Sequence, residues 1–237
     1  MVPNAKAVSL TRITSQTKVE QVQRAILEAI FSGELRPGDR VLEAQLAGQL
    51  GVAQATVNQA LLELHSQGVV LKSLGKSTTV RRFGREELEA LFMVREPLES
   101  AAGVAASRHA TLRSVDLLRV WVDRMRAAAK ADDLSKFYLA DYEFHQELYR
   151  LSDNPFLFQA CQAIAAAPFA YLLSGHLELM PVNYLQVADD HEEIIEALLE
   201  GESKAIDVIG RKMKRWLKVQ LEFLQSPQDQ EKDGTGS

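Results

Sequence analysis

The chain has 237 residues, 46% of them hydrophobic, which is enough apolar material for two cores rather than one. Its longest apolar run, around 163 to 173, is too short for a membrane span, and no signal-peptide block precedes it, so we expect a cytoplasmic protein. The net charge of -5 is unevenly distributed: residues 1 to 84 carry ten Lys/Arg and six Asp/Glu, a net of +4, and the remainder a net of -9. Only the N-terminal part therefore favours a polyanionic partner.

The first part of the chain predicts a small domain over residues 18 to 83, preceded by a flexible arm at 1 to 17. Apolar residues at helical spacing indicate a helix at 19 to 30, which is followed by a short strand at 40 to 42. Two short helices then lie on either side of Gly51. After Gly68 the period becomes extended, and residues 69 to 71 and 78 to 80 indicate a hairpin with its turn at 75 and 76.

This order of elements is that of a helix-turn-helix with a wing, which makes double-stranded DNA the expected partner. In such a unit the second helix enters the major groove, so Gln54, Thr56, Asn58 and Gln59 are the candidate base readers. Lys76, at the wing tip, is expected to meet phosphate or the minor groove. The surplus of +4 is modest for a DNA-binding domain, which suggests that a homodimer shares the affinity. A three-helix core with a hairpin of no function is the alternative.

From residue 86 to 225 the sequence predicts an all-helical domain, so the expected fold class is mainly α, a winged helix-turn-helix followed by a six-helix bundle. Helices are expected near 86 to 108, 112 to 130, 133 to 152, 155 to 174, 182 to 200 and 203 to 225. The polar tail at 226 to 237 is expected to be disordered. The single cysteine, Cys161, cannot form an internal disulfide and indicates a buried helix position rather than a reactive thiol.

Three polar residues fall on apolar helix faces. Asp141 and His145 lie one turn apart on the apolar stripe of one helix, and His191 lies on the buried side of another, whereas its neighbours Asp189, Asp190 and Glu192 are expected to face water. A carboxylate and two imidazoles that converge from two helices suit a divalent transition metal such as zinc, nickel or iron. The alternative is an Asp-His pair that satisfies its own hydrogen bonds.

Four segments resemble those of one regulator family. SGELRPGDRVLEAQLAGQLGVAQATVNQALLELHSQGVV resembles the winged-helix signature of GntR-family transcription regulators, and VREPLESAAGVAA at 94 to 106 resembles the opening helix of the FCD effector domain. DYEFHQEL at 141 to 148 and DHEEIIEALLEG at 190 to 201 resemble its two ligand-bearing segments. Over roughly residues 18 to 225 the chain is similar to FadR-type regulators, and six helices after the boundary resemble the VanR-like branch.

The resemblance implies a ligand-responsive regulator, expected to be a repressor. It implies a homodimer on a short palindromic operator, whose grip changes when a small carboxylate or sugar acid enters the helical domain. Arg95 would then face the cavity and pair with the effector carboxylate, since a planar guanidinium suits that geometry. A surface or interdomain ion pair is the alternative for Arg95.

The recognition helix departs from the family pattern. The family has Ser-Arg and then Val-Arg-Glu where this chain has Ala53-Gln54 and then Val57, Asn58 and Gln59, so two arginines are missing. Amide side chains still pair with adenine, but the electrostatic contribution shrinks. Ala53 also removes an N-cap oxygen, a loss of about 1 kcal/mol of helix stability. An effector-binding dimer that has lost operator recognition is therefore the alternative function.

The metal site departs as well. Metal-binding members of the family use an Asp and three His, and the last of these matches Met213, which the stripe Ile206, Ile209, Met213 and Trp216 places toward the same cavity. A thioether favours zinc poorly, so we expect weak or absent occupancy by zinc or nickel at Asp141, His145 and His191. His176 lies near a helix end and is expected to be exposed. A metal-dependent hydrolase is a further alternative, but no second acid, base or nucleophile stands at recognisable spacing, so we expect no enzyme.

Overall fold

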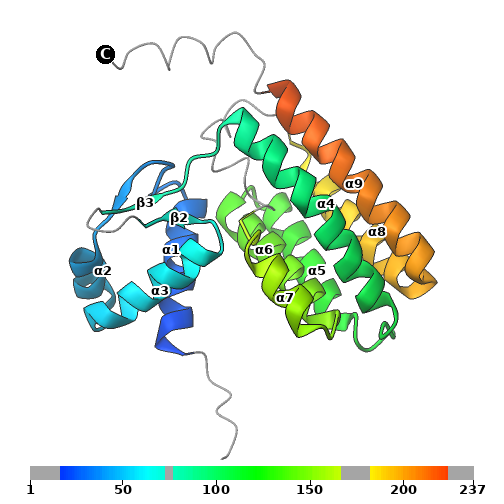
Figure 1. The fold of residues 1–237 in the computed structure, drawn as a ribbon, viewed down its shortest axis with the longest axis horizontal. Helices are drawn as coiled ribbons and strands as arrows, with labels where there is room; N and C mark the ends of the chain where they lie inside the picture. Colours follow the sequence, from blue (N-terminus) through cyan, green and yellow to red (C-terminus); the bar gives the residue numbers. More distant parts are fainter. Residues whose placement is uncertain (1–16, 73–76, 167–181, 224–237) are drawn as a thin grey trace, which may run out of the picture.

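The computed structural model describes residues 17–72, 77–166 and 182–223, which form two lobes (Figure 1). Residues 1 to 16 of the expected arm, the wing turn with Lys76, His176 and the C-terminal tail lie outside these residues. The last residue assigned to the arm, Thr17, is instead the N-cap of the first helix. The N-terminal lobe contains α1 (Lys18–Phe31), β1 (Arg40–Val41), α2 (Glu43–Leu50), α3 (Gln54–Ser66), β2 (Val70–Leu71) and β3 (Thr78–Val80). The C-terminal lobe contains α4 (Arg85–Ser107), α5 (Asp116–Lys130), α6 (Leu134–Leu151), α7 (Pro155–Gln162), α8 (Tyr184–Glu200) and α9 (Glu202–Phe223). The expected mainly α fold with a winged helix-turn-helix is confirmed.

The helix ends of the N-terminal lobe follow local features of the sequence. Thr17 and Glu20 form a capping box at the start of α1, and α2 ends at Gly51 in the left-handed conformation, with φ of 64°. Helix α3 begins after Ala53 with no side-chain cap, as the loss of a serine there predicts. The strands pair antiparallel in the order β1-β3-β2, with Val70 opposite Val80. The buried valines of the sheet, Val41, Val70 and Val80, belong to the same hydrophobic core as the three helices.

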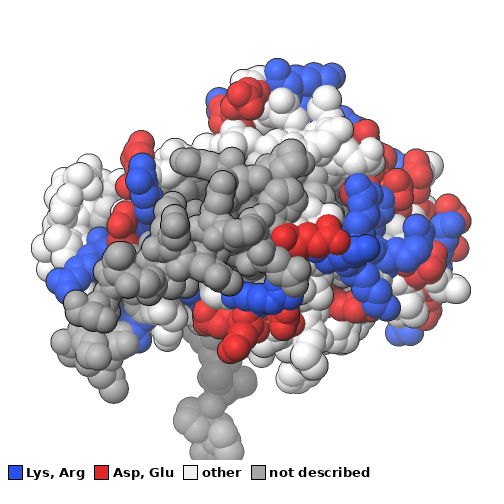
Figure 2. All heavy atoms as spheres, turned by 90° about the horizontal axis from the view of Figure 1, so that it is seen from above, with Lys and Arg blue, Asp and Glu red and all other residues white. Residues whose placement is uncertain are grey.

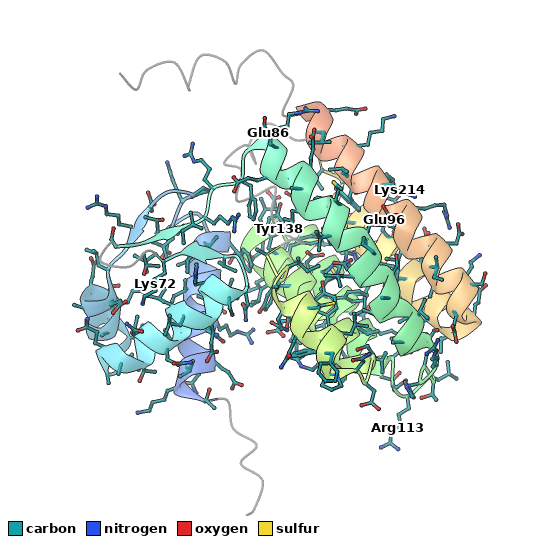
Figure 3. The ribbon with its side chains drawn as sticks, in the orientation of Figure 1. Lys72, Glu86, Glu96, Arg113, Tyr138 and Lys214 are labelled. Atoms are coloured by element: carbon teal, nitrogen blue, oxygen red, sulfur yellow. The ribbon has the colours of Figure 1, made fainter. Side chains whose placement is uncertain are left out.

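In the C-terminal lobe α4 lies along α9 (Figure 1), and Gly103 permits the close approach. A Cβ atom at Gly103 would lie 2.2 Å from Cδ1 of Ile209, so no larger residue fits without a shift. An exposed ion pair, between Glu96 of α4 and Lys214 of α9, crosses the same contact at 3.1 Å (Figure 3). In the described part of the chain no helix has the length and apolarity that a membrane crossing needs.

The prediction of a helix at 155 to 174 is wrong in extent, because α7 ends at Gln162 and residues 163–166 form turns. The amide of Ala166 donates to the carbonyl oxygen of Gln67, at 3.1 Å, rather than to a carbonyl of its own helix. A contact with the other lobe therefore overrides the local alanine-rich helix propensity. The interpretation of Cys161 is confirmed, since its side chain is buried and burial raises the pKa of its thiol to about 12.

Helix α6 connects the two lobes. The rings of Tyr138 and Phe31 have centroids 5.9 Å apart, and the hydroxyl of Tyr142 donates to Oε1 of Gln67, at 3.2 Å. Figure 3 places Tyr138 on the side of α6 that faces the N-terminal lobe. An ion pair at the long distance of 4.0 Å joins Arg24 of α1 to Glu143 of α6. The lobes consequently share one continuous hydrophobic core.

Candidate functional site

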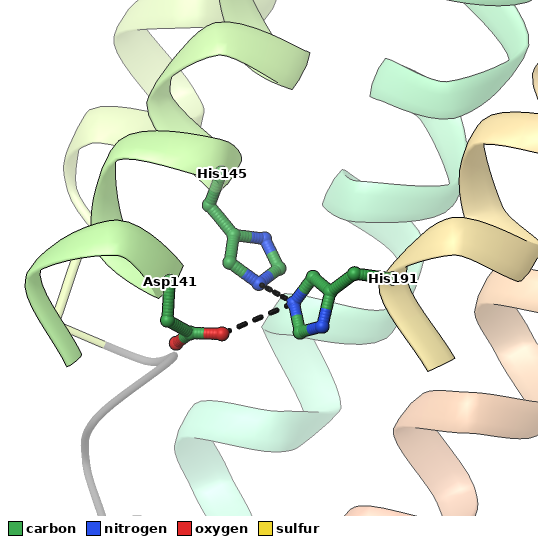
Figure 4. A group of neighbouring side chains, drawn as sticks. All are labelled: Asp141, His145 and His191. Atoms are coloured by element: carbon green, nitrogen blue, oxygen red, sulfur yellow. Dashed lines mark hydrogen bonds and ion pairs between the residues drawn. The ribbon is translucent and has the colours of Figure 1, made fainter. Parts of the chain in front are cut away.

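The three polar residues on apolar faces meet inside the helical lobe (Figure 4). Asp141 and His145 come from consecutive turns of α6 and His191 from α8, and all three side chains are buried. Nε2 of His191 lies 3.0 Å from Oδ1 of Asp141 and 3.4 Å from Nε2 of His145. Two donors bound to one zinc at ordinary distances lie about 3.0 to 3.4 Å apart. The donor types and spacings thus fit a divalent transition metal.

The protonation of the two histidines differs. Nδ1 of His191 donates to the carbonyl oxygen of Val187, at 2.7 Å, which aims Nε2 at the cluster. Burial lowers the pKa of His191, but the hydrogen bond and charge of Asp141 outweigh it, so the pKa is raised. Burial lowers the pKa of His145 well below its usual value, and the positive charges of Arg95 and His191 lower it further. The pKa values of the two histidines are therefore shifted in opposite directions.

Arg95 is buried beside the cluster, with one guanidinium nitrogen, Nη2, 3.5 Å from Nε2 of His145. Its Nε donates to Oε1 of Glu99, one turn along α4, at 2.9 Å. The alternative of a surface ion pair is wrong, because both side chains are at most 5% exposed. The pair with Glu99 lies within one helix.

Glu99 is a residue that the sequence reasoning missed. Besides Arg95, it accepts a hydrogen bond from the hydroxyl of Tyr149, at 2.9 Å, and its Oε1 lies 3.3 Å from Nδ1 of His145. The spacing of Arg95 and Glu99, one turn apart in VREPLE, was the available signal. Glu99 thus balances the charge of Arg95 and borders the ring of His145.

Met213 is buried on α9, but the apolar stripe assigned to it is only partly right, because Ile206 is 51% exposed. Among the described His, Cys, Asp and Glu residues, the group able to hold a metal consists of Asp141, His145 and His191. A fourth ligand of those types does not join them in this part of the chain. The site can therefore offer a metal one carboxylate and two imidazoles, which leaves positions for oxygen ligands from elsewhere.

The prediction that Asp190 faces water is wrong. Its side chain is 3% exposed and accepts from Nζ of Lys212 on α9, at 2.6 Å. Lys212, also missed, is 7% exposed and contacts Glu193 at 2.6 Å. A charged residue can turn inward when a neighbouring helix supplies a counter-charge, which the periodicity of one helix does not reveal.

The four described candidate base readers lie in the first half of α3, as expected, and Gln54 and Gln59 are exposed. All three of their amides have acidic partners. Nδ2 of Asn58 lies 3.2 Å from both carboxylate oxygens of Glu43, Nε2 of Gln59 donates to Glu63 at 2.9 Å, and the side chain of Gln54 also bonds to Glu43. The fourth candidate, Thr56, is half-buried.

The two lobes differ in net charge. Over the described part of the helical lobe that Figure 2 shows, basic and acidic side chains lie next to one another. The N-terminal surplus of positive charge thus remains the electrostatic signal for a polyanion.

Comparison with known proteins agrees with this architecture. Residues 18–80 match the family model described as bacterial regulatory proteins, gntR family, and residues 90–211 match the FCD domain. The chain is 28% identical over 191 residues to the "Probable D-xylose utilization operon transcriptional repressor" of Paenarthrobacter nicotinovorans, which covers 81% of this chain and 83% of that protein. It is 30% identical over 187 residues to the histidine utilization repressor of Klebsiella aerogenes, with 76% and 73% covered.

The fold is also that of a solved regulator. The structure of McbR/YncC from E. coli matches with a TM-score of 0.70 and 20% identity, over 88% of this chain and 99% of that one. A winged helix in the N-terminal lobe, a helical lobe with a buried polar cluster and the two family matches thus lead to one identification. The chain belongs to the GntR family of DNA-binding bacterial transcription regulators and carries an FCD domain.

Proposed function

We propose that the protein is a homodimeric transcription repressor whose grip on its operator is set by a small organic acid in the helical lobe. Two of the relatives compared above are named as repressors, one of a D-xylose utilization operon and one of histidine utilization, which supports the sign of regulation. The observation that carries the proposal is the double role of α6. This helix turns Asp141 and His145 toward the buried cluster, and Tyr142 toward Gln67 at the end of the recognition helix region.

On the DNA side, the proposal assigns base reading to Gln54, Thr56, Asn58 and Gln59 and a backbone contact to Lys76. Asn58→Ala should relax specificity at one base position, because its amide contacts base edges. Lys76→Ala should weaken binding to all sequences and flatten its salt dependence, because a phosphate contact releases counterions. Selection of bound oligonucleotides from a random pool, followed by salt titrations, measures both effects.

On the effector side, the proposal places a carboxylate against Arg95 and the two histidines. The guanidinium supplies positive charge inside the lobe, and Glu99 balances part of it. Asp141 raises the pKa of His191 despite its burial, which favours positive charge there as well. We include a weakly held zinc or nickel on Asp141, His145 and His191, which would polarise the oxygens of the acid when bound. A thermal-shift screen of organic acids, each with and without metal, would identify the effector. If Arg95→Ala then binds that acid as tightly as the parent, Arg95 is not its partner.

Signal transmission through α6 can be tested separately. Tyr142→Phe removes the hydrogen bond to Gln67 and leaves the residues of the polar cluster and of the recognition face unchanged. We expect the variant to bind effector and operator as the parent does, while the effector changes its operator affinity less, because linkage requires a contact that both sites bias. Undiminished coupling in this variant would exclude the hydrogen bond between Tyr142 and Gln67 as the route. A matched control, Tyr138→Phe, removes a hydroxyl that lies 3.2 Å from that of Tyr184 within the same lobe.

One observation favours a second candidate, an effector-binding dimer that no longer recognises an operator. Asn58 and Gln59 occupy the positions at which the family pattern has Arg and Glu. Both amides form hydrogen bonds with acidic residues of their own lobe. The oligonucleotide selection separates the two candidates. Recovery of an enriched palindrome at low salt supports the regulator, and recovery of none supports the DNA-independent dimer.

A further inference from the structure

Glu43 bonds to the side chains of Lys72, Asn58 and Gln54 on the face of the winged-helix lobe that would meet DNA. It is the first residue of α2, and its Oε1 lies 2.8 Å from Nζ of Lys72, just after β2. Nδ2 of Asn58, from the first half of α3, lies 3.2 Å from both carboxylate oxygens. Figure 3 shows Lys72 on the N-terminal lobe. One carboxylate therefore joins the start of the helix-turn-helix, the recognition helix and the base of the wing.

The contacts of Glu43 are partly buried. The side chains of Glu43 and Lys72 are 23% and 21% exposed, which leaves them partly accessible to a ligand but only partly screened by water. The hydrogen bond from Lys72 is the main cause that lowers the pKa of Glu43, with Asn58 and Gln54 adding to it. Glu43 is consequently charged at neutral pH and neutralises the ammonium group of Lys72.

A carboxylate in this place has opposite effects on the two components of DNA affinity. It repels phosphate and occupies a lysine that would otherwise contact phosphate, so it lowers the sequence-independent component. It also fixes the orientation of Asn58, so less side-chain entropy is lost when that amide meets a base edge. The missing arginines of α3 reduce the sequence-independent component in the same direction.

We propose that Glu43 is a specificity-determining residue: it restrains Lys72 and positions Asn58, so that DNA affinity depends on base contacts rather than on phosphate contacts. The proposal rests on the assignment of α3 as the DNA-reading helix. It assigns to an acidic residue, on a surface expected to be basic, the task of suppressing binding to unrelated DNA.

The test compares Glu43→Gln, Lys72→Met and the double variant with the parent. Fluorescence anisotropy measures Kd for the selected operator duplex and for a scrambled duplex over about 50 to 200 mM salt. Glu43→Gln should tighten binding to the scrambled duplex by about threefold to tenfold and steepen its salt dependence by about one counterion, because Lys72 becomes available to phosphate. Operator binding should change less, so the ratio of the two affinities falls.

The non-additivity of the variants isolates Lys72. In the parent background Lys72→Met should leave the salt dependence on scrambled DNA unchanged, whereas in the Glu43→Gln background it should return the slope to the parent value. Lys72→Met keeps the test decisive even if Glu43→Gln fails to fold, because a lower slope in that single variant contradicts the restraint of Lys72. Glu34→Gln is the matched control, since it removes one exposed negative charge beside Asp133 and Lys136 of the helical lobe.

The outcomes separate this inference from the proposed function. If the parent binds DNA of no sequence, the regulator itself is refuted, and the role of Glu43 with it. If the parent selects an operator but Glu43→Gln leaves the affinity ratio unchanged, the role of Glu43 alone is wrong. An equal fall of the ratio in Glu34→Gln would assign the effect to overall charge and would also overturn the inference.

Discussion

Replacement of Lys212 by methionine tests how α8 is held in the helical lobe. Nζ of Lys212 lies 2.6 Å from Oδ1 of Asp190, and the two side chains are 7% and 3% exposed. Removal of one partner from a buried pair typically costs about 3 to 5 kcal/mol, because it leaves an uncompensated charge. Asp190 keeps the amide of Gln186 at 3.3 Å and the guanidinium of Arg215 at 3.5 Å. We therefore expect a loss near the lower end, about 3 kcal/mol.

Urea unfolding, followed by circular dichroism, measures this loss. All variants are compared at one protein concentration, because the apparent stability of the proposed dimer would depend on it. Lys204→Met is the matched control, because its pair with Glu200 spans 3.9 Å at 47% and 59% exposure and should contribute almost nothing. Asp190→Asn combined with Lys212→Met should recover part of the stability, because the remaining amide is neutral. A Lys212→Met variant as stable as Lys204→Met would refute the buried pair.

Three further predictions concern the metal, the pH and the packing of the lobe. If a metal binds, Met213→His should tighten its binding and raise the melting temperature of the protein in the presence of the metal, and His191→Ala should abolish that rise. Elemental analysis measures the metal content, and thermal scans measure the melting temperature. Dialysis-resistant zinc in the parent would contradict the expectation of weak occupancy. Asp141 raises the pKa of His191 against the effect of burial, so their pair stabilises the fold fully below about pH 6.5 and less as the pH rises through the raised pKa; Asp141→Asn should remove this dependence from urea titrations at several pH values. Gly103→Ala forces a Cβ to 2.2 Å from Cδ1 of Ile209 and should cost about 1 to 3 kcal/mol, reduced when Ile209→Val removes that methyl group; equal costs in both backgrounds would count against the contact.

The sequence predicts this fold well because its signals are local. Helical and extended periods, Gly51 and the missing cap at Ala53 each act within a few residues, and the structure has the corresponding helix ends. The convergence of Asp141, His145 and His191 was also predictable, because a polar residue on an apolar stripe must face a partner inside the lobe.

What the sequence does not predict depends on contacts between segments. Asp190 is indistinguishable from its water-facing neighbours until α9 brings Lys212 against it. The end of α7 depends on a hydrogen bond from Ala166 to the other lobe. Asn58 has a surface position in the sequence pattern, but only the fold brings Glu43, fifteen residues earlier, to its amide.

The adjacency of Asp190 and His191 has a mechanical consequence for the helical lobe. Consecutive residues leave a helix about 100° apart, and here one bonds to Lys212 of α9 while the other bonds to Asp141 of α6. Helix α8 can therefore neither rotate about its axis nor slide along it without the loss of one of these two buried polar contacts. We therefore expect α8 to stay in place when a ligand binds at the cluster. The displacement should instead appear in α6, which contacts the DNA-binding lobe.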